Sequence, residues 1–249
     1  IAIIKHADED ELKPLCAKYK KIDEIPFDFT RRRMSVIVED VAGKSQLITK
    51  GAVEEMLGVC SFAEFKGRVE PLTEELKTVI LQNATNFNNK GFRVLGIAHK
   101  TLFGAVGEAV LKEEKDMVLI GYLAFLDPPK ASSKEAIAKL LEYGVGVKIL
   151  TGDNDAVSRY ICSEVGIQTK QIVLGSDLEK MSEAELSKAI NQFNVFAKLT
   201  PDQKTYIVTA LRKQHIVGFM GDGINDAAAM KAADVDISVD TAVDIAKES

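Results

Sequence analysis

The spacing of apolar residues changes character about halfway along the chain. In the first half, short apolar runs broken by turn residues stand between stretches of helical periodicity. A turn at 42–44 joins two of these runs and predicts a β-hairpin. Strands in hairpin order with helices packed outside them make an α+β unit with an antiparallel sheet. The predicted elements are strands at 34–38, 46–49, 92–99 and 118–125 and helices at 1–19, 52–59 and 73–89.

The second half has a different rhythm, which begins after residues 126–130. Short apolar runs alternate there with segments of helical periodicity, and this alternation predicts a doubly wound α/β unit with a parallel sheet. The chain therefore divides into two parts of different fold class. The elements predicted in the second part are strands at 146–150, 171–174, 195–197, 216–220 and 236–239 and helices at 134–143, 156–165, 183–192, 201–213 and 227–233.

Composition narrows the classes of function. The formal net charge of −5 argues against a nucleic-acid-binding surface, and no apolar run approaches the length of a membrane span. Cys16, Cys60 and Cys162 lack metal-ligand spacing and a disulfide pattern, so we expect reduced thiols that pack in the interior. The chain opens on Ile1 without a signal-peptide pattern, and we expect a piece of a longer protein.

A candidate metal site follows the apolar run 216–220. Gly221, Asp222 and Gly223 end this run, and Asn225 and Asp226 precede an Ala-rich helix. Asp222 is therefore expected at the carboxyl end of a strand, where open parallel sheets carry their chemistry. Two carboxylates four residues apart can converge on Mg2+, which prefers oxygen ligands. An ordinary glycine turn followed by a helix cap explains any one of these residues, but not all of them together.

A hydroxyl and a cation are expected at the same edge of the parallel sheet. Thr151 offers its hydroxyl and its N–H to a phosphoryl oxygen, and Gly152 lets the backbone come close, although Thr-Gly-Asp also occurs in ordinary turns. Thr200 fits a helix N-cap and Pro201 the first helical position, which puts Lys204 in the first turn. Together with the carboxylates, these groups predict a phosphoryl-transfer site.

Four motifs in this sequence carry a resemblance to a known family. They are Lys50-Gly51-Ala52, Asp127-Pro128-Pro129, Thr151-Gly152-Asp153 and Gly221-Asp222-Gly223-Ile224-Asn225-Asp226. In order and spacing they resemble the cytosolic signature motifs of P-type cation-transporting ATPases, and the resemblance covers essentially the whole chain. Residues 25–36 are most similar to bacterial magnesium-transporting members, whereas calcium pumps have a longer segment there.

The resemblance implies two domains and a set of site residues. It makes residues 1–123 a nucleotide-binding domain that lacks its N-terminal part, and residues 124–249 a phosphorylation domain of haloacid-dehalogenase-like fold that lacks its first strand. In that family the position of Phe29 stacks on adenine and that of Lys50 lines the same pocket. The implied nucleotide-binding residues are Asp28, Phe29, Lys50, Gly51, Arg93, Asp127 and Lys198. The implied catalytic residues are Thr151, Gly152, Asp153 and Lys204, and the implied Mg2+ ligand is Asp222, with Asn225 and Asp226 supporting the site.

The resemblance also implies a function for the longer protein. It would be an ATP-driven pump, with Mg2+ as the expected cargo, that transfers the γ-phosphate of ATP to an aspartate. That acceptor belongs to an Asp-Lys-Thr-Gly motif upstream of the nucleotide-binding domain, and this motif does not occur in the chain. We therefore expect a soluble fragment that binds ATP and Mg2+ without forming an aspartyl-phosphate. Its partners are then the actuator and transmembrane domains of its own parent, at the cytosolic face of the plasma membrane.

The sequence departs from the family pattern at Lys198, and two other functions share some of its motifs. Lys198 stands where the family has arginine. It keeps the positive charge, but it cannot make the two parallel hydrogen bonds of a guanidinium group. A soluble phosphatase of the haloacid-dehalogenase type with a cap domain shares the carboxylate motif but needs an Asp-X-Asp nucleophile. The Asp-X-Asp spacing at Asp234 and Asp236 follows the metal motif in the wrong chain order. A nucleotide-binding module without turnover is a third reading.

Overall fold

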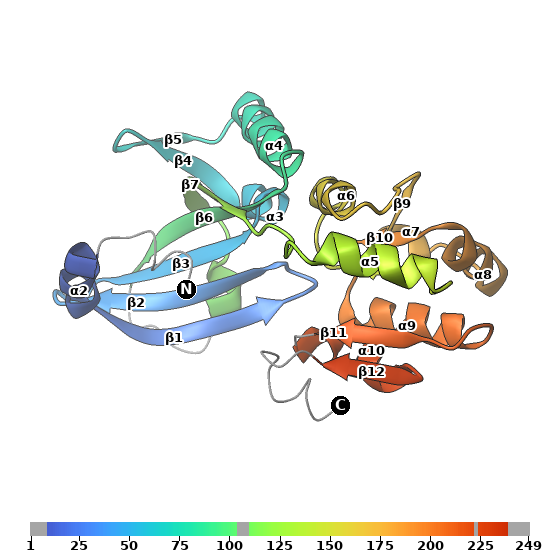
Figure 1. Ribbon diagram of the computed structural model, residues 1–249. Coiled ribbons are helices and arrows are strands. Elements are labelled where there is room, and N and C mark those ends of the chain that lie inside the picture. The colour runs from blue at the N-terminus through green and yellow to red at the C-terminus, as the bar shows by residue number, and fades with distance from the viewer. Residues whose placement is uncertain (1–8, 104–109, 222–223, 239–249) are drawn as a thin grey trace. The chain divides into compact units, whose positions relative to one another are not determined.

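The computed structural model of the chain describes residues 9–103, 110–221 and 224–238 (Figure 1). Contacts divide the chain into two compact units. Unit 1 runs to Asn88 and resumes from Phe92 to Asp127, and unit 2 holds 89–91 and the residues from Pro128 onward. No helix among the described residues is long and apolar enough to cross a bilayer.

Unit 1 is built on a single seven-stranded sheet, in the order β1-β2-β3-β6-β7-β4-β5. Neighbouring strands are antiparallel except β4 and β7, which are parallel. Helices α3 and α4 pack against each other and against β6. The elements are α2 (Glu9–Lys18), β1 (Tyr19–Asp28), β2 (Arg33–Asp40), β3 (Ser45–Ala52), α3 (Val53–Val59), β4 (Cys60–Phe65), β5 (Arg68–Pro71), α4 (Glu74–Asn88), β6 (Phe92–Leu102), the 3-10 helix η1 (Val110–Glu113) and β7 (Met117–Leu126).

The predicted α+β class of this unit is confirmed, and so is the hairpin of β2 and β3. Their turn is closed by Gly43 at a φ of 77° and by Asp40, whose Oδ1 accepts from the N–H groups of Ala42 and Lys44. The prediction missed β1, β4 and β5. Strands β1 and β5 form the edges of the sheet and are largely exposed, so they lack the apolar alternation of a half-buried strand.

Unit 2 alternates helices with parallel strands, as predicted. The described strands form two parallel sheets, β8-β10-β9 and β11-β12, and Leu150 of β8 packs against the apolar clusters beside both of them. The elements are α5 (Ser133–Glu142), β8 (Ile149–Leu150), α6 (Asp155–Glu164), β9 (Ile172–Leu174), α7 (Gly175–Leu178), α8 (Glu183–Gln192), β10 (Val195–Ala197), α9 (Pro201–Arg212), β11 (Gly218–Gly221), η2 (Ile224–Asp226), α10 (Ala227–Ala232) and β12 (Val235–Ser238).

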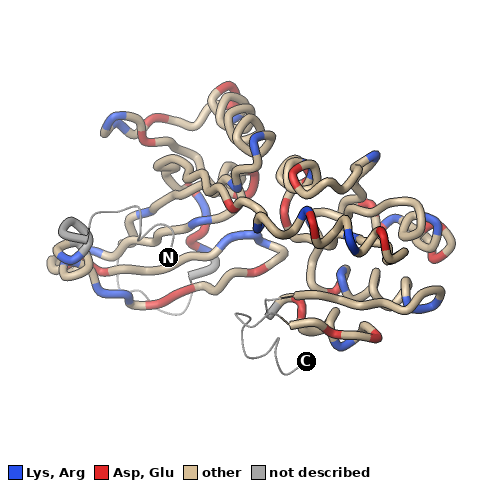
Figure 2. The backbone as a smooth tube through the Cα atoms, viewed as in Figure 1, with Lys and Arg blue, Asp and Glu red and all other residues tan. Residues whose placement is uncertain are grey.

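Two of the three cysteines have the packing role that we expected. Cys60 and Cys162 are buried free thiols, and burial raises the pKa of Cys60 to about 12. Cys16 is exposed, so the packing role expected for it is wrong. Acidic and basic positions are interspersed along both units (Figure 2).

Candidate functional site

The turn between β1 and β2 is built around the carboxylate of Asp28. Its Oδ1 accepts hydrogen bonds from the N–H groups of Thr30 at 2.6 Å and Arg31 at 3.1 Å, and its Oδ2 accepts from Arg31 Nε at 2.8 Å. The N–H of Arg31, its side chain and the N–H of Thr30 hold the pKa of Asp28 below its ordinary value. Phe29 lies within this turn with 37% of its surface exposed, edge-on to Phe27 at 5.2 Å between ring centroids.

Gly51 allows β2 to run very close to the end of β3. A Cβ atom at Gly51 would lie 2.6 Å from Arg33 Cβ and 2.7 Å from the carbonyl oxygen of Arg32, so every residue other than glycine collides with backbone there. The N–H of Ala52 donates to the Arg32 carbonyl at 3.1 Å and seals the contact. Lys50, next to this contact, is exposed. The glycine of the Lys50-Gly51-Ala52 motif therefore allows the β1–β2 turn to lie directly against β3, the strand that carries Lys50.

The sheet order of unit 1 brings two further predicted nucleotide residues, Arg93 and Asp127, to the same end, whereas Lys198 belongs to unit 2. Strands β2 and β6 begin at this end, and β3 and β7 finish there, because all four neighbours are antiparallel. Arg93 stands near the start of β6 and Asp127 directly follows β7, with Arg93 Nη1 3.6 Å from Asp127 Oδ2. One end of the sheet thus carries an exposed aromatic ring, exposed cations and a carboxylate.

In unit 2, the loop after β8 is fastened to the loop after β10. The N–H of Thr151 donates to the carbonyl of Phe196, its carbonyl accepts from the N–H of Leu199, and the N–H of Lys198 donates to the carbonyl of Asp153 at 2.7 Å. The Thr151 hydroxyl donates to Asp153 Oδ2 at 3.2 Å and accepts from the Asp153 N–H at 3.1 Å. Thr151 and Asp153 therefore lie together, beside the segment that leads into α9.

The backbone of Lys198 is in the left-handed region, with a φ of 53°. This conformation costs an L residue about 1–2 kcal/mol, and glycine adopts it freely. We expect Lys198→Gly to have a free energy of unfolding about 1 kcal/mol higher than Lys198→Ala, because both variants lose the side chain and only alanine keeps the strain. Urea unfolding of the two variants measures this difference, and equal midpoints would contradict it.

The helix α9 begins as predicted and delivers Lys204 to a carboxylate. Thr200 is the N-cap, with its Oγ1 accepting from the N–H of Gln203, and Pro201 occupies the first helical position. Lys204 Nζ lies 2.7 Å from Asp226 Oδ1, and the two side chains are only 13% and 16% exposed. A Cβ at Gly221 would lie 2.6 Å from Asp226 Cβ, so the glycine that ends β11 makes room for this pair.

The donor set of the expected metal site consists of oxygen atoms. Asn225 and Asp226 of η2 supply an amide and a carboxylate oxygen, the donor type that suits Mg2+. Asp222 and Gly223 lie outside the described residues, so the expected ligand Asp222 stays a prediction. The carboxylate of Asp226 already bonds the ammonium group of Lys204, so the structure brings together a cation and an anion that the sequence assigned to one phosphoryl-transfer site.

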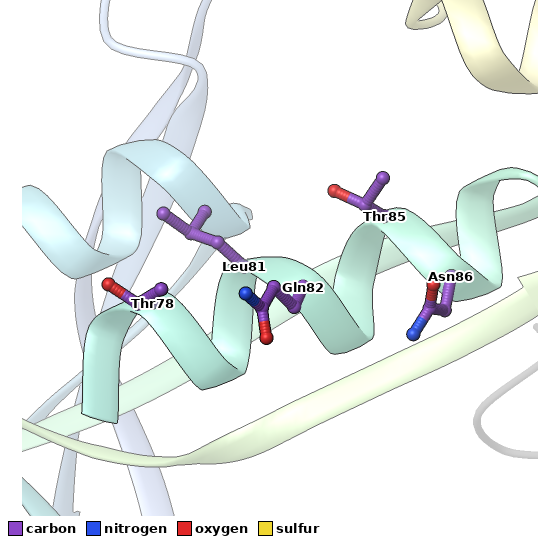
Figure 3. Close-up of a pocket in the computed structure, with 5 residues that line it drawn as sticks. All are labelled: Thr78, Leu81, Gln82, Thr85 and Asn86. Atoms are coloured by element: carbon purple, nitrogen blue, oxygen red, sulfur yellow. The ribbon is translucent and has the colours of Figure 1, made fainter. Parts of the chain in front are cut away.

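Two features of unit 1 were not singled out from the sequence. Arg31 also bonds the carboxylate of Glu114, a residue far along the chain that no motif contains. A shallow hollow on α4, lined by side chains of one helix and without an ionisable group, includes none of the predicted site residues (Figure 3). Its lining residues are Thr78, Leu81, Gln82, Thr85 and Asn86.

Comparisons with known proteins agree on one family. A family model described as P-type ATPase, cytoplasmic domain N, matches residues 1–132. The chain is 45% identical over all 249 residues to the protein named magnesium-transporting ATPase, P-type 1, of Escherichia coli K12, and covers 28% of it. A protein of the same name from Salmonella typhimurium LT2 is 52% identical over 237 residues, which are 94% of the chain and 26% of that protein. Calcium-transporting ATPase 1 of Lactococcus lactis is 31% identical over 254 residues, covering 100% of the chain and 29% of that protein. The chain thus spans less than a third of the length of these relatives.

Proposed function

Because the chain belongs to the P-type ATPases, we propose that the end of the unit 1 sheet described above binds ATP. Phe29 stacks on the adenine base, and Lys50 and Arg93 face the phosphates. The observation that carries the proposal is the contact at Gly51, which fastens the turn bearing Phe29 beside the strand bearing Lys50. An exposed aromatic face beside cations suits a base joined to phosphates. Unit 1 then acts as the nucleotide-binding domain.

Unit 2 then acts as the phosphorylation domain. The Thr151 hydroxyl and the Lys204 ammonium group contact the phosphate oxygens, and Gly152 allows a close approach. Asp222, with Asn225 and Asp226 supporting the site, would hold Mg2+, which would neutralise charge on the phosphates. Phosphoryl transfer depends on such positioning and charge compensation more than on covalent help from further groups.

The acceptor of the phosphoryl group is an aspartate elsewhere in the parent chain. Its carboxylate oxygen bonds the γ-phosphorus of ATP as the bond to the bridging oxygen breaks and ADP leaves. Support comes from the topology of unit 2: β8 pairs with β10 and β11 pairs with β12, and within the described ranges neither β8 nor β11 has a strand on its other edge. The proposed strand that carries the acceptor pairs along these edges of β8 and β11, beside Thr151 and Asp226.

The parent couples this reaction to cation transport through membrane helices and an actuator domain. Magnesium is the proposed cargo, since the relatives named for magnesium transport share 44–52% of their residues with the chain and those named for calcium share 31–34%. The proposed location is the cytosolic face of the plasma membrane.

Binding of a non-hydrolysable ATP analogue tests the nucleotide site. Calorimetric titration of the chain with AMP-PNP is expected to show weak binding that Phe29→Ala weakens about tenfold or more, since a stacked base contributes about 1–3 kcal/mol. Lys50→Ala should also weaken the binding, because it removes a cation that faces the phosphates. Lys44→Ala, in the exposed turn at the far end of the β2–β3 hairpin, is the matched control and should leave the affinity unchanged. Unchanged affinity in both site variants would refute the assignment.

A further inference from the structure

Glu114 is a carboxylate buried inside unit 1, between η1 and β7. Its side chain is 1% exposed, although glutamate is among the residues that are rarely buried. Arg31 Nη1 donates to both of its oxygens at 2.8 Å, Arg33 Nε donates to Oε2 at 2.8 Å, and the hydroxyl of Ser35 donates to Oε1 at 2.7 Å. Ser35 also hydrogen-bonds Thr49 at 2.7 Å. The carboxylate thus gathers groups from the β1–β2 turn, β2 and β3.

The charges in this cluster are matched. Burial by itself would raise the pKa of Glu114, but hydrogen bonds from Ser35, Arg31 and Arg33 outweigh it and hold the pKa below its ordinary value. Glu114 is therefore ionised, and it compensates two arginines that would otherwise repel each other. Removing one partner of such a group leaves uncompensated charge behind.

Arg31 connects this cluster to the turn that carries Phe29. Its Nε donates to Asp28 Oδ2, its Nη1 to Glu114, and its Nη2 to the carbonyl of Pro26 at 3.0 Å. Asp28 in turn organises the backbone of the turn through the N–H groups of Thr30 and Arg31. The chain of contacts therefore runs from Glu114 through Arg31 to Asp28. Asp28 directly precedes Phe29 and bonds the backbone that follows it.

The other end of this chain of contacts is itself anchored. Lys100 Nζ pairs with Glu113 Oε2 at 2.9 Å and donates to the carbonyls of Glu113 and Lys115. The hydroxyl of Ser61 donates to Asp116 Oδ1 at 2.9 Å. Both neighbours of Glu114 are thus tied to β6, and Asp116 to β4, so Glu114 is a fixed point from which the turn is held.

We propose that Glu114 is a positioning residue of the nucleotide site: through Arg31 and Asp28 it holds the β1–β2 turn in the conformation that presents Phe29 to the base. The role in binding rests on the proposed ATP function, whereas the ordering of the turn does not. A buried carboxylate with two arginines adds little net stability compared with apolar packing, but it fixes one arrangement of the groups around it. Arg31 has a structural role here, because its side chain donates hydrogen bonds to Asp28, Glu114 and the carbonyl of Pro26.

The absence of tryptophan from the sequence allows a direct test. Phe29→Trp gives a protein with a single indole in the turn. In this background Glu114→Gln, which keeps the shape and removes the charge, is expected to lower the fluorescence anisotropy of the folded protein and increase quenching by acrylamide. It should also weaken AMP-PNP binding about tenfold, as expected when Phe29 is no longer held in position to stack on the base. Glu74→Gln, which breaks an exposed pair with Lys77 in α4, is the matched control and should change neither readout.

Further variants separate positioning from stability. Ser35→Ala removes one hydrogen bond to Glu114 and leaves both arginine contacts, so it should lower the unfolding midpoint without changing the anisotropy or the affinity. If Glu114→Gln does not fold, Arg31→Lys decides, because lysine keeps the charge and cannot bond Glu114 and Asp28 together as arginine does. Unchanged anisotropy in Glu114→Gln, or in Arg31→Lys if Glu114→Gln does not fold, overturns the proposal. If the chain without substitutions does not bind AMP-PNP, the ATP function is refuted. The anisotropy result still decides whether Glu114 orders the turn.

Discussion

Gly51→Ala is expected to weaken AMP-PNP binding more than tenfold and to lower the free energy of unfolding by about 1–3 kcal/mol, the range for overpacking a closed contact. The physical reason is the 2.6–2.7 Å approach of an added Cβ to Arg33 Cβ and the Arg32 carbonyl oxygen. Strand β2 has to move away from β3, and the turn bearing Phe29 moves with it. The hydrogen bond from Ala52 to Arg32 is then lost.

The chain contains its own control for this substitution. Gly58 lies in α3, and a Cβ added to it has nothing within 4 Å. Gly58→Ala is therefore expected to raise the free energy of unfolding by about 0.5–1 kcal/mol, because alanine favours the helix, and to leave the affinity unchanged. Urea unfolding and calorimetric titration of the two variants measure both effects. A free energy of unfolding that is unchanged or higher in Gly51→Ala would show that the contact at Gly51 is not a constraint.

Replacement of Lys204 by methionine is expected to lower the free energy of unfolding of unit 2 by about 3 kcal/mol. Lys204 and Asp226 are largely buried and 2.7 Å apart, so the substitution leaves a buried carboxylate without its cation. The double variant Lys204→Met with Asp226→Asn should recover most of the loss, since it removes both charges. In the full-length parent, we expect either single change to abolish phosphoenzyme formation, because both groups belong to the proposed phosphate site.

An exposed ion pair in the same unit serves as the control for this cycle. Lys213 and Glu183 are 3.6 Å apart, with side chains 63% and 83% exposed. Lys213→Met should therefore change the free energy of unfolding by less than about 0.5 kcal/mol. Chemical unfolding of the unsubstituted chain, the two single variants at Lys204 and Asp226 and the double variant gives the coupling energy of this pair. A coupling energy near zero would show that Lys204 and Asp226 do not stabilise the folded protein as a pair, although they lie close together in the structure.

Local signals in the sequence predicted much of unit 2. The capping of α9 by Thr200 and Pro201 was confirmed because caps depend on neighbouring residues alone. Helix α8 and strand β10 match their predicted bounds, since helical periodicity and a short apolar run bounded by polar residues are both local patterns. The glycines at 51 and 221 were also noticed as parts of motifs. Their physical role was not predicted, because it depends on what lies opposite them in space.

Strands that depend on distant partners were missed. Strand β4 pairs with β7, which lies more than fifty residues further along, and nothing in 60–65 indicates that pairing. Glu114 was missed for the same reason: its environment comes from Arg31, Arg33 and Ser35, about eighty residues away. A glutamate in a polar stretch of sequence predicts a solvated side chain, and only the closing of the sheet buries it.

The sequence by itself determined the two-part organisation, the alternation of the second part and the motifs that identify the family, because periodicity, caps and glycine turns act over a few residues. The tertiary structure decided which of those residues meet. It joined the Phe29 turn to the Lys50 strand through Gly51, paired Lys204 with Asp226, and buried Glu114 under two arginines. These contacts join segments that are 18 to 83 residues apart. They exist only once the strands have paired, since a carboxylate or a missing Cβ has no consequence until a partner lies within a few ångströms.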